Sequence, residues 1–322
     1  MAVVSIVQNA DIELAVQEAI RLLGGIDSIV KPGDKVAIKP NLVTAQPSDS
    51  GITTNPQVIS TIIELCKTVK PSELTIVQGS SGADTKFAFE ACGYSELASR
   101  YDIELVDLNE CPTTTVKVPE GGSLQTLEVP NIILESDVLI NVPKLKLYRR
   151  VKWASLALKN LVGAVPGKGE YTETRISKFS LEMSREYWSP EGKWFLPYYK
   201  QWFNPTREKK KLHMNLAEGI IDLNTVIRPT LNVIDGITVC RDPDITHYDT
   251  ATLDLNTILA GTDSLAVDCI GVKIRGMDPS DISYLRCAIE RSIGESDYSR
   301  IQVVGTPLKE IIESYNELVH ED

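Results

Sequence analysis

Lysines that lie on or just beyond apolar segments are the residues of this chain best suited to chemistry. Lys39 emerges directly from the apolar strand predicted at 36–43, VAIKPNLV. Burial removes the hydration of a lysine ammonium, which is costly unless an anion lies beside it. Without such an anion, the pKa of the lysine falls toward the range that is useful in catalysis. We therefore expect Lys39 to act in a site; a lysine whose ammonium reaches the surface is the alternative.

In residues 140–169, INVPKLKLYRRVKWASLALKNLVGAVPGKG, six cations follow a predicted strand: Lys144, Lys146, Arg149, Arg150, Lys152 and, within a predicted helix, Lys159. Pro143 should end the strand because proline has no backbone N–H to donate. The helix is expected over 153–162, stopped by the glycines and proline that follow. In open α/β sheets, such a junction is typical of an anion site. A solvated basic loop is the alternative, but the net charge of −11 makes a local cluster of cations more informative.

Polar residues also mark the ends of other predicted strands. Because the carboxyl ends of parallel strands meet at one edge of a sheet, we expect these residues to converge there. The Gly-Ser-Ser-Gly turn at 79–82 offers N–H and hydroxyl groups to an oxyanion, although a plain turn would look the same. It lacks the glycine patterns of nucleotide-binding loops. The candidate substrate-binding residues are Asn41, Asn55, Ser80, Ser81, Lys144, Lys146 and Asp235.

Histidine and carboxylate side chains supply a second set of candidates. His213 begins a predicted helix that also carries Glu218 and Asp222, so an acid–base or metal group is conceivable there. The spacing matches no zinc motif, and no metal site is predicted. Asp263 is expected to cap the helix that follows it.

Predicted strands and helices alternate along nearly the whole chain. This order indicates an α/β fold with a mostly parallel sheet and helices on both faces, in Rossmann-like layers. We expect a single unit over 1–322; a division into lobes 1–135 and 136–322 stays open. A helix is predicted over 85–98, with Phe87 and Phe89 in the core, and a β-hairpin over 112–130.

Composition excludes several classes of protein. With 44 acidic and 33 basic side chains, the chain has no global basic field to attract nucleic acid. No stretch reaches the roughly 20 apolar residues of a membrane span, and the N-terminus does not resemble a signal peptide, so a cytoplasmic protein is expected. The six cysteines form no C-x-x-C pair, which predicts reduced, buried thiols rather than disulfides, a zinc site or an iron–sulfur cluster.

Residues 168–212 differ in composition from the rest of the chain, since they hold ten of its 20 aromatic residues. This aromatic-rich insertion could be a lid over an apolar or aromatic substrate, a surface for a partner or for a homodimer, or an interfacial membrane anchor. Its prolines and the lack of a long amphipathic period count against the anchor. A lid or an oligomer contact is the preferred interpretation.

Together these segments resemble the family called domain of unknown function 362. The resemblance rests on motifs in the expected order across nearly the whole chain: Lys39-Pro40-Asn41, Thr54-Asn55-Pro56, Gly79-Ser80-Ser81-Gly82, NVPKLK at 141–146, LKNLVGxxPG at 158–167, the His213 helix, VIDGI at 233–237 and the turn at 261–268. It implies the fold more than the chemistry. Some members carry additional cysteine clusters that resemble those of ferredoxins, and this chain lacks them.

Two further points come from that resemblance. Family members often have a histidine shortly after PKLK, where this chain has Tyr148, so any role of that histidine is lost or altered here. The element that contains Lys159 is similar to one in nickel-pincer lactate racemases, which implies contact with a substrate or cofactor anion. The histidine set of those racemases does not map onto this chain, and racemase activity is not expected.

The function expected from the sequence is an enzyme that acts on a small organic anion in a lysine-rich cleft at the strand ends, under an aromatic lid. Lys39, Lys159, Tyr148 and His213 are the candidate catalytic residues, with chemistry based on acid–base transfer or stabilisation of negative charge. The sequence does not indicate which cofactor, if any, the protein binds, and no iron–sulfur cluster is expected. The alternative is a non-catalytic binding or assembly protein whose aromatic-rich insertion docks a partner.

Overall fold

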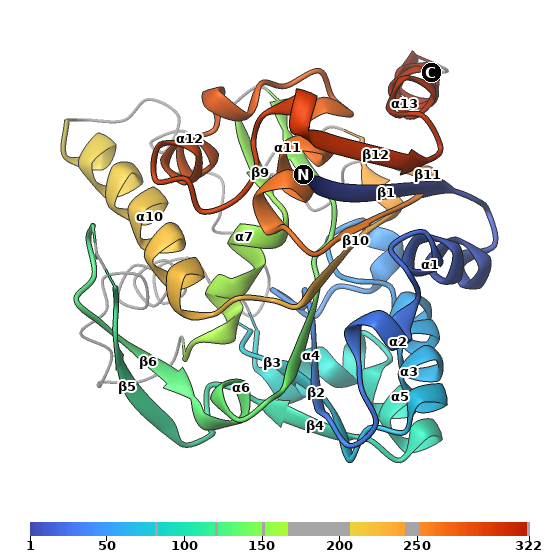
Figure 1. The fold of residues 1–322 in the computed structure, drawn as a ribbon, viewed down its shortest axis with the longest axis vertical. Helices are drawn as coiled ribbons and strands as arrows, with labels where there is room; N and C mark the ends of the chain where they lie inside the picture. Colours follow the sequence, from blue (N-terminus) through green and yellow to red (C-terminus); the bar gives the residue numbers. More distant parts are fainter. Residues whose placement is uncertain (81–82, 120–121, 150–151, 167–206, 242–250, 321–322) are drawn as a thin grey trace.

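A computed structural model describes residues 1–80, 83–119, 122–149, 152–166, 207–241 and 251–320; for 207–215 only the backbone is described. Figure 1 shows a central sheet with helices packed on both of its faces. The predicted α/β class is therefore confirmed. The aromatic-rich insertion over 168–212 lies almost entirely outside the described residues.

The described residues form one central sheet of eight strands in the order β12-β1-β11-β10-β7-β2-β3-β4. The pairs from β10 through β7, β2 and β3 to β4 are parallel, and β1 is parallel to β12. Strand β11 runs antiparallel to both β1 and β10. The strands are β1 (Ala2–Gln8), β2 (Lys35–Pro40), β3 (Glu73–Gln78), β4 (Glu104–Asp107), β7 (Val138–Val142), β10 (Leu231–Cys240), β11 (Thr252–Gly261) and β12 (Ile301–Gly305).

Alternation along the strands decides which side chains meet each layer of helices, because successive residues point to opposite faces. On β2, Val36 and Ile38 join the hydrophobic cluster beneath α1, α3, α4 and α5, whereas Ala37 joins the cluster on the other face. Lys39 lies two residues after Ala37, so its side chain points to the same face of the sheet. The helices of the first layer are α1 (Ile12–Arg21), α2 (Ile26–Ile29), α3 (Pro56–Val69), α4 (Thr85–Ala91) and α5 (Tyr94–Tyr101).

The helices of the opposite layer all come after residue 130 (Figure 1). They contribute buried leucine, isoleucine and valine side chains to the clusters that cover the other face of the sheet. These helices are α6 (Asn131–Leu134), α7 (Ala157–Asn160), α10 (Arg207–Val226), α11 (Ser264–Lys273), α12 (Ser283–Glu290) and α13 (Leu308–His320), with short 3-10 turns η3 (Leu161–Ala164), η4 (Pro279–Asp281) and η5 (Tyr298–Arg300). A further 3-10 turn, η1 (Ser48–Ser50), lies in the loop after β2.

Two hairpins lie beside the central sheet. The hairpin predicted over 112–130 is confirmed as β5 (Thr113–Lys117) paired with β6 (Thr126–Pro130). A second hairpin pairs β8 (Lys146–Tyr148) with β9 (Trp153–Ser155). The helix predicted over 153–162 is therefore wrong at its start: residues 153–155 are a strand, and only Ala157–Asn160 form an α-helix before η3. Pairing with β8 outweighed the local helical period.

The helix predicted over 85–98 is two helices, because Gly93 adopts a positive φ of 79° between α4 and α5. Phe87 was expected in the core but is 58 % exposed, whereas Phe89 is buried. Phe87 and Phe89 are two positions apart on α4, so their rings lie on different faces of the helix and only one of them can face the core.

Five of the six cysteines are buried, as predicted, and Cys111 is half-buried. In the part of the chain that the structure describes, no helix is long and apolar enough to cross a membrane. Nor do the described residues bring three or more histidine, cysteine or acidic side chains together in a group that could hold a metal ion.

Candidate functional site

Lys39 is fully buried at the end of β2, on the face covered by α7 and η3. Its Nζ donates to the carbonyl of Pro40 at 3.1 Å and to Oε1 of Gln78 at 3.0 Å. Both acceptors are neutral. Burial, and then repulsion by Lys146, lowers the pKa of Lys39 to about 7. Gly163 of η3 packs directly above, where an added Cβ would lie 3.2 Å from the ammonium.

Lys146, the first residue of β8, is buried next to Lys39. Its Nζ donates to Oδ1 of Asn41 at 2.6 Å and to the carbonyl of Ile52 at 3.0 Å. Burial, and then repulsion by the charge of Lys159, lowers the pKa of Lys146 to about 7. The contact with Ile52 also fixes the long loop after β2. Gly51 of that loop has a φ of +70° and leaves no room for a side chain against the backbone of Cys240.

Lys159 lies on the four-residue helix α7 and is half-buried. No described residue accepts a hydrogen bond from its ammonium, although burial lowers the pKa of Lys159 to about 8. Asp268 of α11 holds the start of this helix, since its carboxylate accepts from the N–H groups of Ala157 at 2.7 Å and Leu158 at 3.1 Å. Burial raises the pKa of Asp268 to about 8, against the effect of those two donors.

Asparagine amides connect the strand ends beneath the lysines. Asn41 donates to Asn160 at 2.7 Å, Asn160 to Asn141 at 2.8 Å, and Asn141 to Asn232 at 2.9 Å. A chain of this kind orients each amide through its neighbours, so that Oδ1 of Asn41 faces Lys146. These hydrogen bonds hold the ends of β2, β7 and β10 and the helix α7 in fixed positions relative to one another.

Lys144 differs from the other lysines because it has a carboxylate partner. Its Nζ lies 2.9 Å from Oδ2 of Asp235, and both side chains are fully buried. The same carboxylate accepts from the N–H groups of Asn55 at 2.7 Å and Ile237 at 2.9 Å. Both carboxylate oxygens of Asp235 therefore already accept hydrogen bonds from the protein. The side chain of Asn55 caps α3 through the N–H of Gln57 at 2.8 Å.

The remaining candidates have different positions. Ser80 is buried and donates its hydroxyl to the carbonyl of Leu42. Tyr148 ends β8, is half-buried and pairs in register with Trp153. Ser81 lies outside the described residues, as does the side chain of His213, whose backbone is part of α10. The structure therefore brings Lys39, Asn41, Lys144, Lys146, Lys159 and Asp235 together at one edge of the sheet.

Four residues of this group are not among the site residues predicted from the sequence: Gln78, Asn141, Asn160 and Asp268. Asn141 was expected only as the start of a polar strand end, and Asp268 only as a residue beside a helix start, in the turn at 261–268. Asn141 and Gln78 each interrupt or end a buried strand, and Asp268 interrupts the apolar run SLAVDCIGV. A polar residue inside a buried element must have a partner, and this signal could have found them. Asp222 was weighed as a partner of His213, but its carboxylate accepts from the N–H groups of Gly122, Ser123 and Leu124 and pairs with Arg291.

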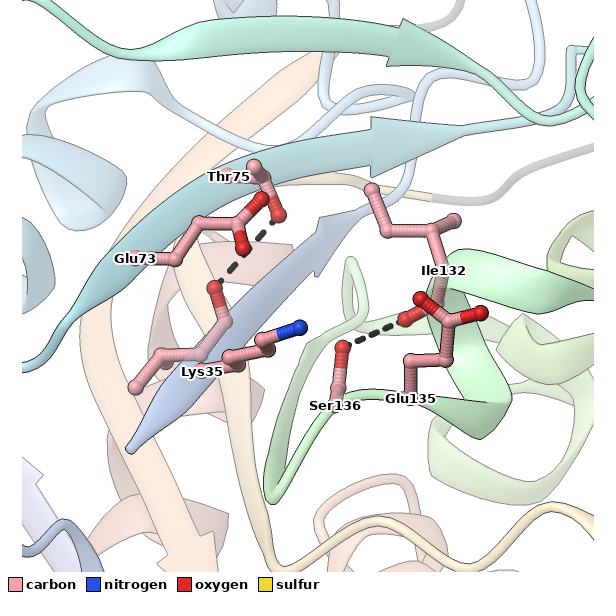
Figure 2. Close-up of a pocket in the computed structure, with 7 residues that line it drawn as sticks. Lys35, Glu73, Thr75, Ile132, Glu135 and Ser136 are labelled. Atoms are coloured by element: carbon pink, nitrogen blue, oxygen red, sulfur yellow. Dashed lines mark hydrogen bonds between the residues drawn. The ribbon is translucent and has the colours of Figure 1, made fainter. Parts of the chain in front are cut away.

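A separate cavity of about 190 Å³ lies at the opposite edge of the sheet. Figure 2 shows Lys35, Glu73 and Glu135 around it, with Thr75 and Ser136 bonded to backbone carbonyls. Lys35 and Glu73 begin their strands, so this hollow is a strand length away from the lysines described above. It does not contain the residues on which the site depends.

Comparison with known proteins agrees with this arrangement of motifs. The family model described as domain of unknown function (DUF362) matches residues 36–273, which contain all the strand ends of the site. The chain belongs to the DUF362 family. It is 27% identical over 264 residues to the thylakoid-associated protein sll1697 of Synechocystis sp. (strain ATCC 27184 / PCC 6803 / Kazusa), a match that covers 81% of this chain and 68% of that protein.

A solved structure with a related arrangement is the lactate racemase apoprotein from Thermoanaerobacterium thermosaccharolyticum. The TM-score is 0.42 at 14% sequence identity, and the match covers 86% of this chain. This DUF362 chain spans 58% of the length of that racemase chain.

Proposed function

We propose that this DUF362 protein is an enzyme that binds a small organic anion between Lys39, Lys146 and Lys159 and stabilises the negative charge that develops during its reaction. One observation carries the proposal. Among the described residues, these three lysines lie together at the carboxyl ends of the strands and have no carboxylate partner.

The lysine beside them provides an internal comparison. Lys144 is as fully buried as Lys39, and the chain supplies Asp235 to neutralise it. An unpaired buried ammonium is costly, because amide and carbonyl acceptors do not replace a counter-ion. An anionic ligand would supply the missing charge. Lys39 and Lys146 each direct two described hydrogen bonds at neutral acceptors, and a protonated lysine has three donors.

The lowered pKa values of these lysines bear on the type of reaction. A group whose pKa is about 7 exchanges protons readily at neutral pH, so one lysine can take a proton while its neighbour remains an ammonium. This pairing suits abstraction of a proton next to a carboxylate, with the ammonium stabilising the resulting charge. Tyr148 at the end of β8 is the candidate for a second acid or base. In this proposal Lys144, Asp235 and Asn55 support the site rather than bind substrate.

Calorimetric titration with a panel of small carboxylates and phosphate tests the proposal. We expect at least one anion to bind to the wild type, with affinity falling at least tenfold in Lys146→Met, since a lost charge contact is worth about 1.5–3 kcal/mol. Lys152→Met is the matched control, because Lys152 is exposed and paired with Asp281 at 3.0 Å. Equal binding to both variants, or no binding to the wild type, would contradict the proposal.

A further inference from the structure

Lys159 is the lysine of this site that is best placed to react. Lys39 and Lys146 are buried and each holds two acceptors, which fixes their ammonium groups. Lys159 is half-buried, and no described residue accepts a hydrogen bond from its Nζ. Among the described residues, nothing therefore fixes its ammonium group, and its side chain is partly exposed.

The surroundings of Lys159 connect it to the proposed anion site. Its neighbour Asn160 accepts a hydrogen bond at 2.7 Å from Asn41, and Asn41 in turn accepts from Lys146 at 2.6 Å. The positive charge of Lys159 also lowers the pKa of Lys146, so the two amines are close enough to interact electrostatically. A ligand whose anionic group meets Lys146 would bring its other end toward Lys159.

Resting on the proposed function, we propose that Lys159 forms an imine with the carbonyl carbon of a small oxo acid, whose carboxylate is held by Lys146 and Lys39. The lone pair of Nζ forms the new C–N bond. The bonds between the carbonyl carbon and its oxygen break, and the oxygen leaves as water with one proton from Nζ and one from the solvent. Nζ keeps its second proton, which gives the protonated imine, and no oxidant or reductant is consumed. The protonated imine then withdraws electrons from the neighbouring carbon of the substrate.

The protonation state of Lys159 fits this step. Only the neutral amine is a nucleophile, and an ordinary lysine is about 0.1 % neutral at pH 7.5. With a pKa of about 8, roughly a quarter of Lys159 is neutral at that pH. The described carboxylate of Asp268 binds the backbone of α7 rather than the lysine, so it does not hold Lys159 in its charged form.

Trapping of the imine tests the proposal. The full-length protein is incubated with glyoxylate and sodium cyanoborohydride at pH 7.5, and the lysines that gain a carboxymethyl group are mapped by peptide mass spectrometry. We expect Lys159 to be modified at least tenfold faster than the exposed Lys152. Lys159→Arg keeps the charge but should abolish this fast modification. Modification spread evenly over the exposed lysines would overturn the imine.

Two controls separate the imine from the anion site beneath it. Acetaldehyde has no carboxylate, so its trapping on Lys159 should not change in Lys146→Met, whereas trapping of glyoxylate should fall about tenfold. Glycolate has a carboxylate but no carbonyl carbon able to form an imine, and its binding is measured by calorimetry. Glycolate binding that depends on Lys146, without fast modification of Lys159, overturns the imine and leaves the anion site standing. If glycolate, glyoxylate and every anion of the calorimetric panel fail to bind, the proposed function fails as well.

Discussion

At the scale of single residues, the neighbouring pair of Lys144 and Lys39 shows how the chain treats buried charge in two ways. Lys144 lies 2.9 Å from a carboxylate, whereas Lys39 contacts only neutral acceptors among the described residues. Replacing a satisfied ion pair by apolar residues often changes stability little, but an unmatched buried charge destabilises the fold. We therefore interpret Lys39 and Lys146 as retained for function at a cost in stability.

The pH dependence of unfolding should reveal this cost. The folded-state pKa of Lys39 is about 7, below its ordinary value of 10.5, so between these values the unfolded chain binds more protons than the folded one. Stability contributed by this group must then rise with pH from about 7 to about 10. Lys39→Met should flatten that rise in urea unfolding curves measured at pH 7 and pH 9. Parallel pH profiles for wild type and variant would count against an unpaired buried ammonium.

A carboxylate introduced beside Lys39 should compete with an anionic ligand for the positive charge of that lysine. Gln78 accepts from Lys39 at 3.0 Å, and Gln78→Glu would place a carboxylate at that position. We expect this variant to lose at least about tenfold in affinity for any small anion, because Lys39 is then neutralised internally. The hydrogen bond from Nε2 of Gln78 to the carbonyl of Leu42 is lost, but Ser80 still donates to that carbonyl.

Calorimetry on Gln78→Glu and on Gln78→Met separates charge from packing. The methionine variant also loses the hydrogen bonds of the amide but adds no charge, so it should keep more of the anion affinity. Equal losses in the two variants would show that charge at Lys39 does not govern binding.

At the scale of elements, the short helix α7 depends on a partner from outside its own sequence. Four residues are too few to form a stable helix alone, and its first N–H groups would be buried without acceptors. Asp268 supplies both acceptors from α11. The position of Lys159 and Asn160 is therefore set by a carboxylate more than a hundred residues away in the chain.

Asp268→Ala should destabilise the protein by about 2–4 kcal/mol, since two buried N–H groups lose their acceptor. Asp11→Ala is the matched control: Asp11 caps α1 at the surface through the N–H of Leu14, and its loss should cost about 1 kcal/mol. Urea unfolding of both variants gives the comparison. A loss at Asp268 no larger than at Asp11 would mean that the contact does not hold α7.

The elements also show what the sequence could and could not predict. Strand ends such as Lys39-Pro40-Asn41 follow from local patterns, because an apolar run that stops at polar residues is a local signal. The split of 153–162 into β9 and α7 follows from pairing between Lys146 and Ser155, which no local period records. Likewise, nothing in the sequence near Lys144 and Asp235 indicates that they pair, since 91 positions separate them.

At the scale of the whole molecule, the chain carries a net charge of −11 and yet places at one edge of its sheet lysines that have no carboxylate partner among the described residues. The net negative charge of the chain repels anions, so the site must attract them at short range. Exposed charges more than about 10 Å away are largely screened at physiological salt, whereas buried groups are not. This arrangement favours a small ligand that enters the site over an extended polyanion bound across the surface.

Deleting residues 170–205 distinguishes the two functions expected from the sequence. The chain on both sides is anchored, because Leu161 and Ala164 of η3 and Ala217 and Ile220 of α10 are buried in the core. We expect a folded protein with an unchanged oligomeric state and at least fivefold weaker binding of its anion, as for a lid. Light scattering and calorimetry provide the two measurements. A change of oligomeric state with unchanged anion binding would favour the assembly protein.

The measurement that tests the central claim most directly is a crystal structure of the protein grown with the small anion that binds it most tightly in calorimetry. The anion site predicts density for the charged group within about 3 Å of at least one ammonium of Lys39, Lys146 or Lys159, the distance of a charge-assisted hydrogen bond. It also predicts that this density is absent in crystals of Lys146→Met. An anion bound elsewhere, with the lysines in contact only with protein and water, would contradict the account.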